Sequence, residues 1–126
     1  MRDAILSVFI FITIMFVVFF FNNSIINLCD DITNKSNEIE LCLLQDDLET
    51  SYALSLDLLN NIKSKYTITS VYLNHTDIDN LINEGIRLST YILHGDKSEA
   101  STSLYLLQSN TSHIRDLQIP KLENLF

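Results

Sequence analysis

Tryptophan is absent from this chain of 126 residues, and glycine and proline occur only twice and once. Hairpins and tight turns need such residues at short intervals, so the composition argues against an all-β fold. Two glycines are also too few for most phosphate-binding loops. The patterns Gly-x-Ser-x-Gly, His-Glu-x-x-His and Cys-x-x-Cys are missing as well. We therefore expect no enzymatic activity, no cofactor and no bound metal ion.

Basic residues are scarce too. From residue 27 onward the chain carries 15 aspartates and glutamates against seven lysines and arginines. Phosphate backbones are bound by clustered cations, so nucleic acid is not an expected partner. The same imbalance argues against a tight electrostatic hold on anionic lipid headgroups. The ordinary interpretation of such an acidic surface is solubility.

What the chain has in abundance is a long apolar run at its start. No charged residue occurs from Ala4 to Phe21, and 14 of these 18 residues are Ile, Leu, Val or Phe. A helix of this length extends about 27 Å, close to the hydrocarbon thickness of a bilayer. The apolar residues favour membrane insertion by roughly 4 to 8 kcal/mol. We predict a transmembrane anchor over residues 1–26.

A cleaved signal peptide is the alternative interpretation of this run. Its apolar region is typically about 7 to 15 residues long and ends in small residues. Here the run is longer and ends in Phe19-Phe20-Phe21-Asn22-Asn23, so retention as an anchor is favoured. The amino terminus and Arg2 precede the span, with Asp3 offsetting one of these charges, whereas residues 27–45 hold four acidic residues against one lysine. Cations favour the cytoplasm, which predicts a cytoplasmic N-terminus and a C-terminal domain outside the cell membrane.

The rest of the chain has helical spacing, so the predicted fold class is all-α. Residues 27–45 are predicted as a helical stalk that continues the anchor, and residues 46–126 as an extracytoplasmic bundle of about three helices. The stalk has a narrow stripe with the 3-4 spacing of a core-facing helix. Its members are Ile25, Leu28, Ile32, Lys35, Ile39 and Cys42.

The first helix of this bundle is predicted to start behind an N-cap at Asp46 and Asp47. The β-branched stretch of residues 67–71 either loosens this helix or carries it to about Leu73. Its expected inner face consists of Leu48, Tyr52, Leu56, Leu59, Ile62 and Tyr66.

Two further helices follow, each with a capping signal. Thr76 with Asp79 resembles a capping box, and Gly95 is a plausible helix stop. Asp96 opens the last helix and Pro120 is expected to end it. The predicted inner faces are Ile78, Leu81, Ile82, Leu88 and Ile92 in one helix, and Ala100, Leu104, Leu107, Ile114 and Leu117 in the other.

The two cysteines, Cys29 and Cys42, are 13 positions apart. On one continuous helix this separation is roughly 20 Å, far beyond the reach of a disulfide. We expect both to be small apolar packing residues. Pairing of Cys29 with its copy in a second chain is the open alternative.

One group of polar residues could assemble a site. His75 and Asp79 are four apart and share a helix face. An antiparallel hairpin turning at Gly95 would bring His113 close to both, while His94 falls at its other end. Such a cluster could hold a metal or move protons, but we favour a hydrogen-bonded cluster that caps a helix and fixes its register.

The chain resembles the domain of unknown function 4363 family in three features. The first is the apolar N-terminal segment. The second is the run Leu73-Asn74-His75-Thr76-Asp77-Ile78-Asp79-Asn80, which is similar to the family's Asn-His-x-x-Ile-Asp pattern. The third is the end of the chain, with His113-Ile114 followed by Asn124-Leu125-Phe126. Leu48 stands where the family usually has a tryptophan. The resemblance implies a small single-anchor membrane protein of spore-forming Gram-positive bacteria with no assigned activity. It also implies an accessory role beside a multi-span membrane protein of the YetF type.

These observations favour a non-enzymatic accessory or interaction module, whose outer bundle packs against a membrane partner or another copy of itself. The alternative is a ligand- or metal-sensing domain centred on His75, Asp79 and His113. That alternative predicts saturable binding to the domain, lost when these residues are mutated. A small membrane-bound hydrolase is a third, less favoured possibility.

Overall fold

The computed structural model describes the backbone of residues 1–125 and the side chains of residues 1–118. Five helices make up this part of the chain: α1 (Arg2–Leu44), α2 (Leu48–Ser64), α3 (Tyr66–Tyr72), α4 (His75–Leu93) and α5 (Lys97–Leu125). The predicted all-α class, with a long N-terminal helix and a bundle after it, is confirmed.

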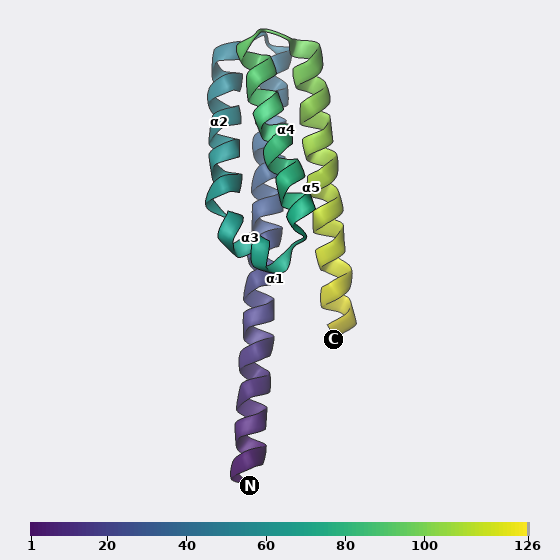
Figure 1. The fold of residues 1–126 in the computed structure, drawn as a ribbon. Coiled ribbons are helices and arrows are strands. Elements are labelled where there is room, and N and C mark those ends of the chain that lie inside the picture. The colour runs from purple at the N-terminus through teal and green to yellow at the C-terminus, as the bar shows by residue number, and fades with distance from the viewer. Residues whose placement is uncertain (126) are drawn as a thin grey trace.

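The longest helix, α1, has two halves with different surroundings. It contains 43 residues and is therefore about 64 Å long. Its N-terminal part projects alone from the molecule, and the remainder lies among the other helices (Figure 1). Every side chain from Met1 to Ile14 is exposed, and Phe9 and Phe16 are 68 % and 73 % exposed. By length and composition, this helix could cross a membrane.

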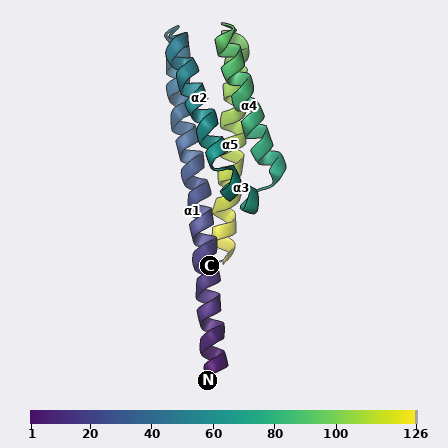
Figure 2. The same ribbon diagram turned by 60° about the vertical axis from the view of Figure 1, so that its left-hand side comes forward.

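The segment predicted as a stalk is itself one of the helices of the bundle. α1 lies against α2 and α5, and α4 lies against the same two helices. The chain runs up α1, down α2 and α3, up α4 and down α5, so neighbouring helices are antiparallel (Figures 1 and 2). This is the up-down-up-down arrangement of four-helix bundles. The stalk therefore contributes a quarter of the core rather than merely carrying it.

The buried face of α1 is wider than the predicted stripe. Ile25, Leu28, Ile32 and Ile39 are buried as expected, and Lys35 and Cys42 are partly covered. A second column with a spacing of seven residues is also buried: Asn22, Cys29, Ser36 and Leu43. Two of its four members are polar, which hid the column from a search for apolar residues. A repeat of seven residues is typical of helices that cross at the shallow angle of left-handed bundles.

The core face of α2 differs from the predicted one. Ser51 and Ser55 are buried together with Leu58 and Ile62, whereas Leu56, expected inside, is 37 % exposed. The hydroxyl of Ser51 donates to the Asp47 carbonyl at 2.8 Å, and that of Ser55 to the Tyr52 carbonyl at 2.7 Å. A hydroxyl bonded within its own helix leaves no unmet polar group. The two serines therefore act as small core residues, which an apolarity pattern does not reveal.

The turns after α1 and α4 have the same geometry. Each helix ends in a Schellman motif, with a left-handed residue just past the helix cap. After α4 this residue is Gly95, with φ of 76°, and the amide of Asp96 donates to the Tyr91 carbonyl at 2.9 Å. After α1 it is Asp46, with φ of 59°, and the next amide donates to the Cys42 carbonyl at 2.9 Å. The predicted stop at Gly95 is confirmed.

Two of the predicted caps are confirmed and one is wrong. Asp47 caps α2 by accepting the Thr50 amide at 3.2 Å, and Asp96 caps α5 by accepting the Glu99 amide at 3.2 Å. For α4 the cap is Asn74, which accepts the Thr76 amide at 3.1 Å, rather than Thr76 itself. Asparagine two positions earlier is the stronger capping residue, so the helix starts there.

Three further details separate the structure from the expectation. The helix that begins with α2 breaks at Lys65 and resumes as α3, which ends at Tyr72. Leu117 is 45 % exposed, and Gln118, at 1 %, takes the core position in its place. Pro120 does not end α5, which continues to Leu125. A proline removes one amide donor from the helix ladder but does not by itself force the chain to leave the helix.

Asp46 provides a test of the turn geometry. It is the one residue other than glycine with positive φ in the described backbone, and its carboxylate pairs with Lys97. Asp46→Ala should lower the free energy of unfolding by about 1 kcal/mol, because a Cβ without a local hydrogen-bonding group strains the left-handed conformation. Asp46→Gly should not lower it. Urea unfolding in detergent, followed by circular dichroism, measures both.

Lys97→Gln is the control for the ion pair of Asp46. Both side chains are largely exposed, so the pair should contribute no more than about 0.5 kcal/mol. Equal losses in Asp46→Gly and Asp46→Ala would show that the carboxylate, and not the backbone conformation, determines the stability of this turn.

Candidate functional site

The three residues predicted to form a polar cluster all face solvent. His75 and Asp79 lie on the first turns of α4, and His113 lies on α5 beside the buried Ile114. Within the described residues, no hydrogen bond or ion pair connects any two of them. In the same part of the chain, no group of three His, Cys, Asp or Glu residues could hold a metal ion. The α4–α5 hairpin forms as expected, but these side chains do not point into it.

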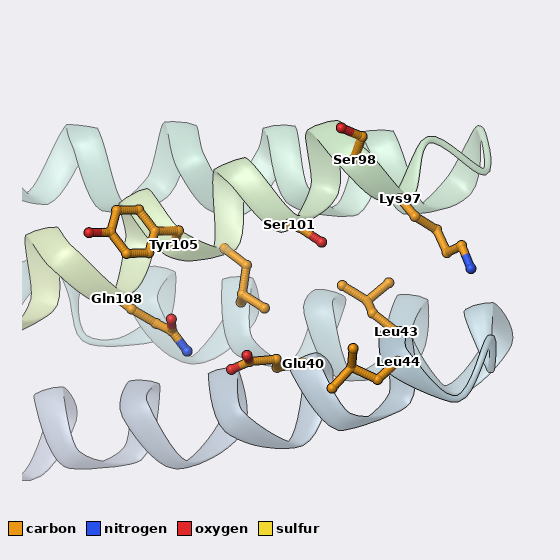
Figure 3. A pocket seen from close by; sticks show the side chains of 9 residues that line it. Glu40, Leu43, Leu44, Lys97, Ser98, Ser101, Tyr105 and Gln108 are labelled. Carbon is orange, nitrogen blue, oxygen red and sulfur yellow. The ribbon is translucent and has the colours of Figure 1, made fainter.

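A groove of about 530 Å³ lies between α1 and α5, at the end of the bundle far from the N-terminus (Figure 3). Leu43 and Leu104 are almost fully buried in it, whereas Leu44 and Tyr105 at its border are 76 % and 70 % exposed. The complete lining is Glu40, Leu43, Leu44, Lys97, Ser98, Ser101, Leu104, Tyr105 and Gln108.

The groove combines leucine side chains with a few polar groups. No histidine or cysteine borders it. Glu40 and Lys97 supply one charge of each sign, and the remaining polar groups are hydroxyls and one amide. An apolar floor with a sparse polar rim resembles the grooves in which a helix of another protein docks.

The groove could not be found by following either helix alone. Its walls come from residues 40–44 and 97–108, which meet only once α5 has paired with α1. One sequence signal does point toward it: Leu44 and Tyr105 are large apolar residues that lie outside the heptad positions of the core.

Polar bridges connect α1 to both of its neighbours. Lys35 reaches Asp57 of α2 at 2.9 Å and Asp31 of its own helix at 3.6 Å. The amide of Asn61, also on α2, donates to the Asp31 carboxylate. On the other side, Arg115 of α5 donates to the Asp30 carboxylate at 2.9 Å. Such partly exposed pairs contribute little energy each, but together they disfavour any shift of register along α1.

Glu84 is the buried acid that the sequence pattern missed. It is 8 % exposed on α4, where Oε1 accepts a hydrogen bond from Arg87 at 3.1 Å. Oε2 has no partner among the described side chains. Next to it, a Cβ added to Gly85 would come within 3.0 Å of the Leu59 Cδ1 atom, so the glycine allows α4 to approach α2 closely. One carboxylate with one arginine is not a catalytic constellation.

The two cysteines are free, and α1 holds them apart on one unbroken helix. Cys29 is 2 % exposed. Burial, with a smaller contribution from the charge of Asp30, raises the pKa of its thiol to about 11. Cys42 is partly covered. Cys29 is thus a packing residue, as expected, and its burial argues against a disulfide with a second chain.

The family model described as a domain of unknown function (DUF4363) matches residues 19–125. The matched range begins in α1 near the end of the apolar run and includes all of α2, α3 and α4 and all of α5. No curated protein and no solved structure matches the chain.

The burial of Cys29 predicts a large difference in thiol reactivity. With a pKa of about 11, only about one thiol in a thousand is ionised at pH 8, and the thiolate is the reactive form. In the folded protein, maleimide should modify Cys42 and leave Cys29 untouched until urea unfolds the bundle. Mass spectrometry of the labelled protein, with Cys42→Ser as the control, measures this. Rapid labelling of Cys29 in the native state would show that α1 separates from the bundle.

Proposed function

The chain belongs to the family of the domain of unknown function DUF4363, and on this premise we propose that it is a single-pass membrane protein with a non-enzymatic accessory role. The observation that carries the proposal is the exposed apolar half of α1. Its side chains form a contiguous apolar surface that is far larger than the apolar patches that monomeric proteins expose to water. A bilayer covers such a surface without any other protein.

The dimensions of α1 support the anchor. Asn22 is the first buried residue of the helix, and before it only Met15, Val18 and Phe21 are partly covered. The free part measures about 30 Å, which equals the thickness of the hydrocarbon core. No linker separates it from the bundle, because one helix contains both. The anchor would therefore set the height and the direction of the bundle.

The charges at the two ends of the apolar run support a cytoplasmic N-terminus. Arg2 and the amino terminus lie before the run, and the acidic bundle lies after it. The bundle would then lie outside the cell membrane, as a small extracytoplasmic domain.

The groove between α1 and α5 is the surface on which we expect a partner. Leu44 is 23 residues beyond Phe21 on the same helix, hence roughly 34 Å farther from the membrane. A multi-span protein of the YetF type could reach it only with a domain outside the bilayer. A second copy of this chain has its own groove at the same height and meets this requirement automatically. Both partners remain compatible with the proposal.

A topology measurement tests the orientation. Ser98 is exposed at the far end of the bundle, so Ser98→Cys, in a chain with both native cysteines replaced by alanine, should react with a membrane-impermeant maleimide in intact cells. Asp3→Cys in the same background should react only after lysis. The reverse pattern would place the bundle in the cytoplasm and contradict the proposed location.

Photocrosslinking tests the accessory role. With benzoylphenylalanine at Tyr105, irradiation of native membranes should give an adduct with a second protein or a second copy, since this side chain borders the groove. Ala53, exposed on α2, is the matched control position and should give none. Leu44→Asp should reduce the Tyr105 adduct several-fold. Recovery of monomer alone from both positions would contradict an interaction module.

A further inference from the structure

α3 lies at the base of the bundle, the end from which the N-terminal part of α1 projects and past which the last turns of α5 extend (Figures 1 and 2). This short helix passes from α2 to α4 at that end and contacts α1 (Figure 1). Tyr72 stacks on Phe21, with ring centroids 6.3 Å apart. Phe21 is also the last residue of the apolar run that starts at Ala4. Because of this contact, α3 lies at the level along α1 where the apolar run ends.

Apolar and aromatic side chains of α3 are uncovered at this level. Val71 is 73 % exposed and Tyr66 is 37 % exposed. In a domain surrounded by water, an exposed valine beside partly exposed tyrosines has no evident structural role. At the boundary between acyl chains and headgroups, by contrast, tyrosine is an enriched residue, because its ring is apolar and its hydroxyl is polar.

The same segment contains no carboxylate. No aspartate or glutamate occurs between Asp57 and Asp77, although the chain has 16 of them. Lys63 and Lys65 lie in this interval, and both are exposed and form no ion pair with the described residues. Lysine stems can lie along apolar surface while the ammonium groups reach lipid phosphates.

Some of the nearest carboxylates already have partners. On α1, Asp30 is paired with Arg115 and Asp31 with Lys35. Asp77 and Asp79 lie on the first turns of α4, directly after α3. Between Asp57 and Asp77, Lys63 and Lys65 are the only Lys, Arg, Asp or Glu residues, on a chain whose net charge is −8.

We propose that residues 63–73, the base segment, rest on the headgroup layer of the membrane that α1 crosses. Lys63 and Lys65 contact anionic lipid phosphates, and Tyr66 and Val71 reach the edge of the acyl chains. The proposal rests on the proposed anchoring of α1 and adds a second membrane contact to it. Continuity with the anchor and complementary charge favour lipid, rather than another protein, as the occupant of this surface.

Single tryptophans test the contact, since the chain has none of its own. The full chain is reconstituted in vesicles of equal parts phosphatidylglycerol and phosphatidylcholine. Val71→Trp should be quenched by lipids with a headgroup nitroxide and shielded from acrylamide. Leu93→Trp, at a position 61 % exposed at the other end of the bundle, should show the opposite behaviour. Equal acrylamide quenching of the two tryptophans would overturn the proposal.

A third reporter separates this proposal from the anchor. Phe11→Trp, in the middle of the apolar run, should be quenched by lipids brominated on their acyl chains. If Phe11→Trp is quenched and Val71→Trp is not quenched by headgroup nitroxides, the anchor stands and the base contact fails. If Phe11→Trp is not quenched either, the anchoring itself fails.

Charge variants test the lipid partner. Lys63→Gln with Lys65→Gln should weaken nitroxide quenching of Val71→Trp in the anionic vesicles and leave it unchanged in phosphatidylcholine alone. Lys97→Gln, at the far end, is the control and should have no effect. If the double variant keeps the full nitroxide quenching in anionic vesicles, the phosphate contact is overturned.

If Val71→Trp is open to acrylamide in vesicles but shielded in native membranes, a protein covers the segment and the lipid contact is refuted.

Discussion

The fold depends on a single helix whose two parts have different surroundings. Up to Phe21, α1 carries apolar side chains in every direction, as expected of a helix surrounded by lipid. From Asn22 onward only the faces at heptad spacing are buried, and most of the remaining positions are polar. The hydrogen-bond ladder continues through this change without interruption. The other helices therefore leave the N-terminal part of α1 uncovered.

This constraint explains the connections of the bundle. A chain that rises along one fixed helix and must cover it on both sides needs neighbours of matching length. The two Schellman turns, at Asp46 and Gly95, reverse the chain at the far end within a few residues. At the near end, α3 fills the distance between α2 and α4 and meets Phe21 through Tyr72. Polar bridges of Lys35 and Arg115 then fix how far α2 and α5 are shifted along α1.

The helix caps could be predicted from the sequence, whereas the face that each helix turns toward the core could be predicted only in part. Caps such as Asp47 and Asp96 depend on neighbouring amides, so the sequence contains nearly all of the information. The core faces of α1 and α4 were largely predicted, because apolar residues occupy most of their core positions. The face of α2 was only partly predicted, because Ser51 and Ser55 occupy core positions with hydroxyls bonded to their own helix. Gln118 displaced Leu117 in α5 for a related reason: heptad spacing from Thr111 and Ile114 outweighs polarity.

The candidate site shows the same limit. Hairpin numbering from Gly95 gives the level of His113 along the axis of α5, but not its direction. One residue changes the direction by about 100°, and burial of Ile114 turns His113 to the solvent. The groove at Leu44 and Tyr105 depends on outward positions of two helices, which no pattern within one helix reports.

Net charge illustrates why whole-chain averages mislead about the membrane. The chain carries −8 overall, which argues against broad adhesion to anionic lipid. Screening limits such interactions to about 8 to 10 Å at physiological salt. If the base segment rests on lipid as proposed, only the base of the bundle is within this range, so Lys63 and Lys65 are attracted, while the acidic residues at the far end of the bundle are too far away to oppose them. Any tilt of the bundle would bring those acidic residues toward the anionic membrane surface, and repulsion between the like charges would oppose the tilt. Attraction at the base and repulsion farther up then act together, holding the bundle upright with its groove away from the membrane.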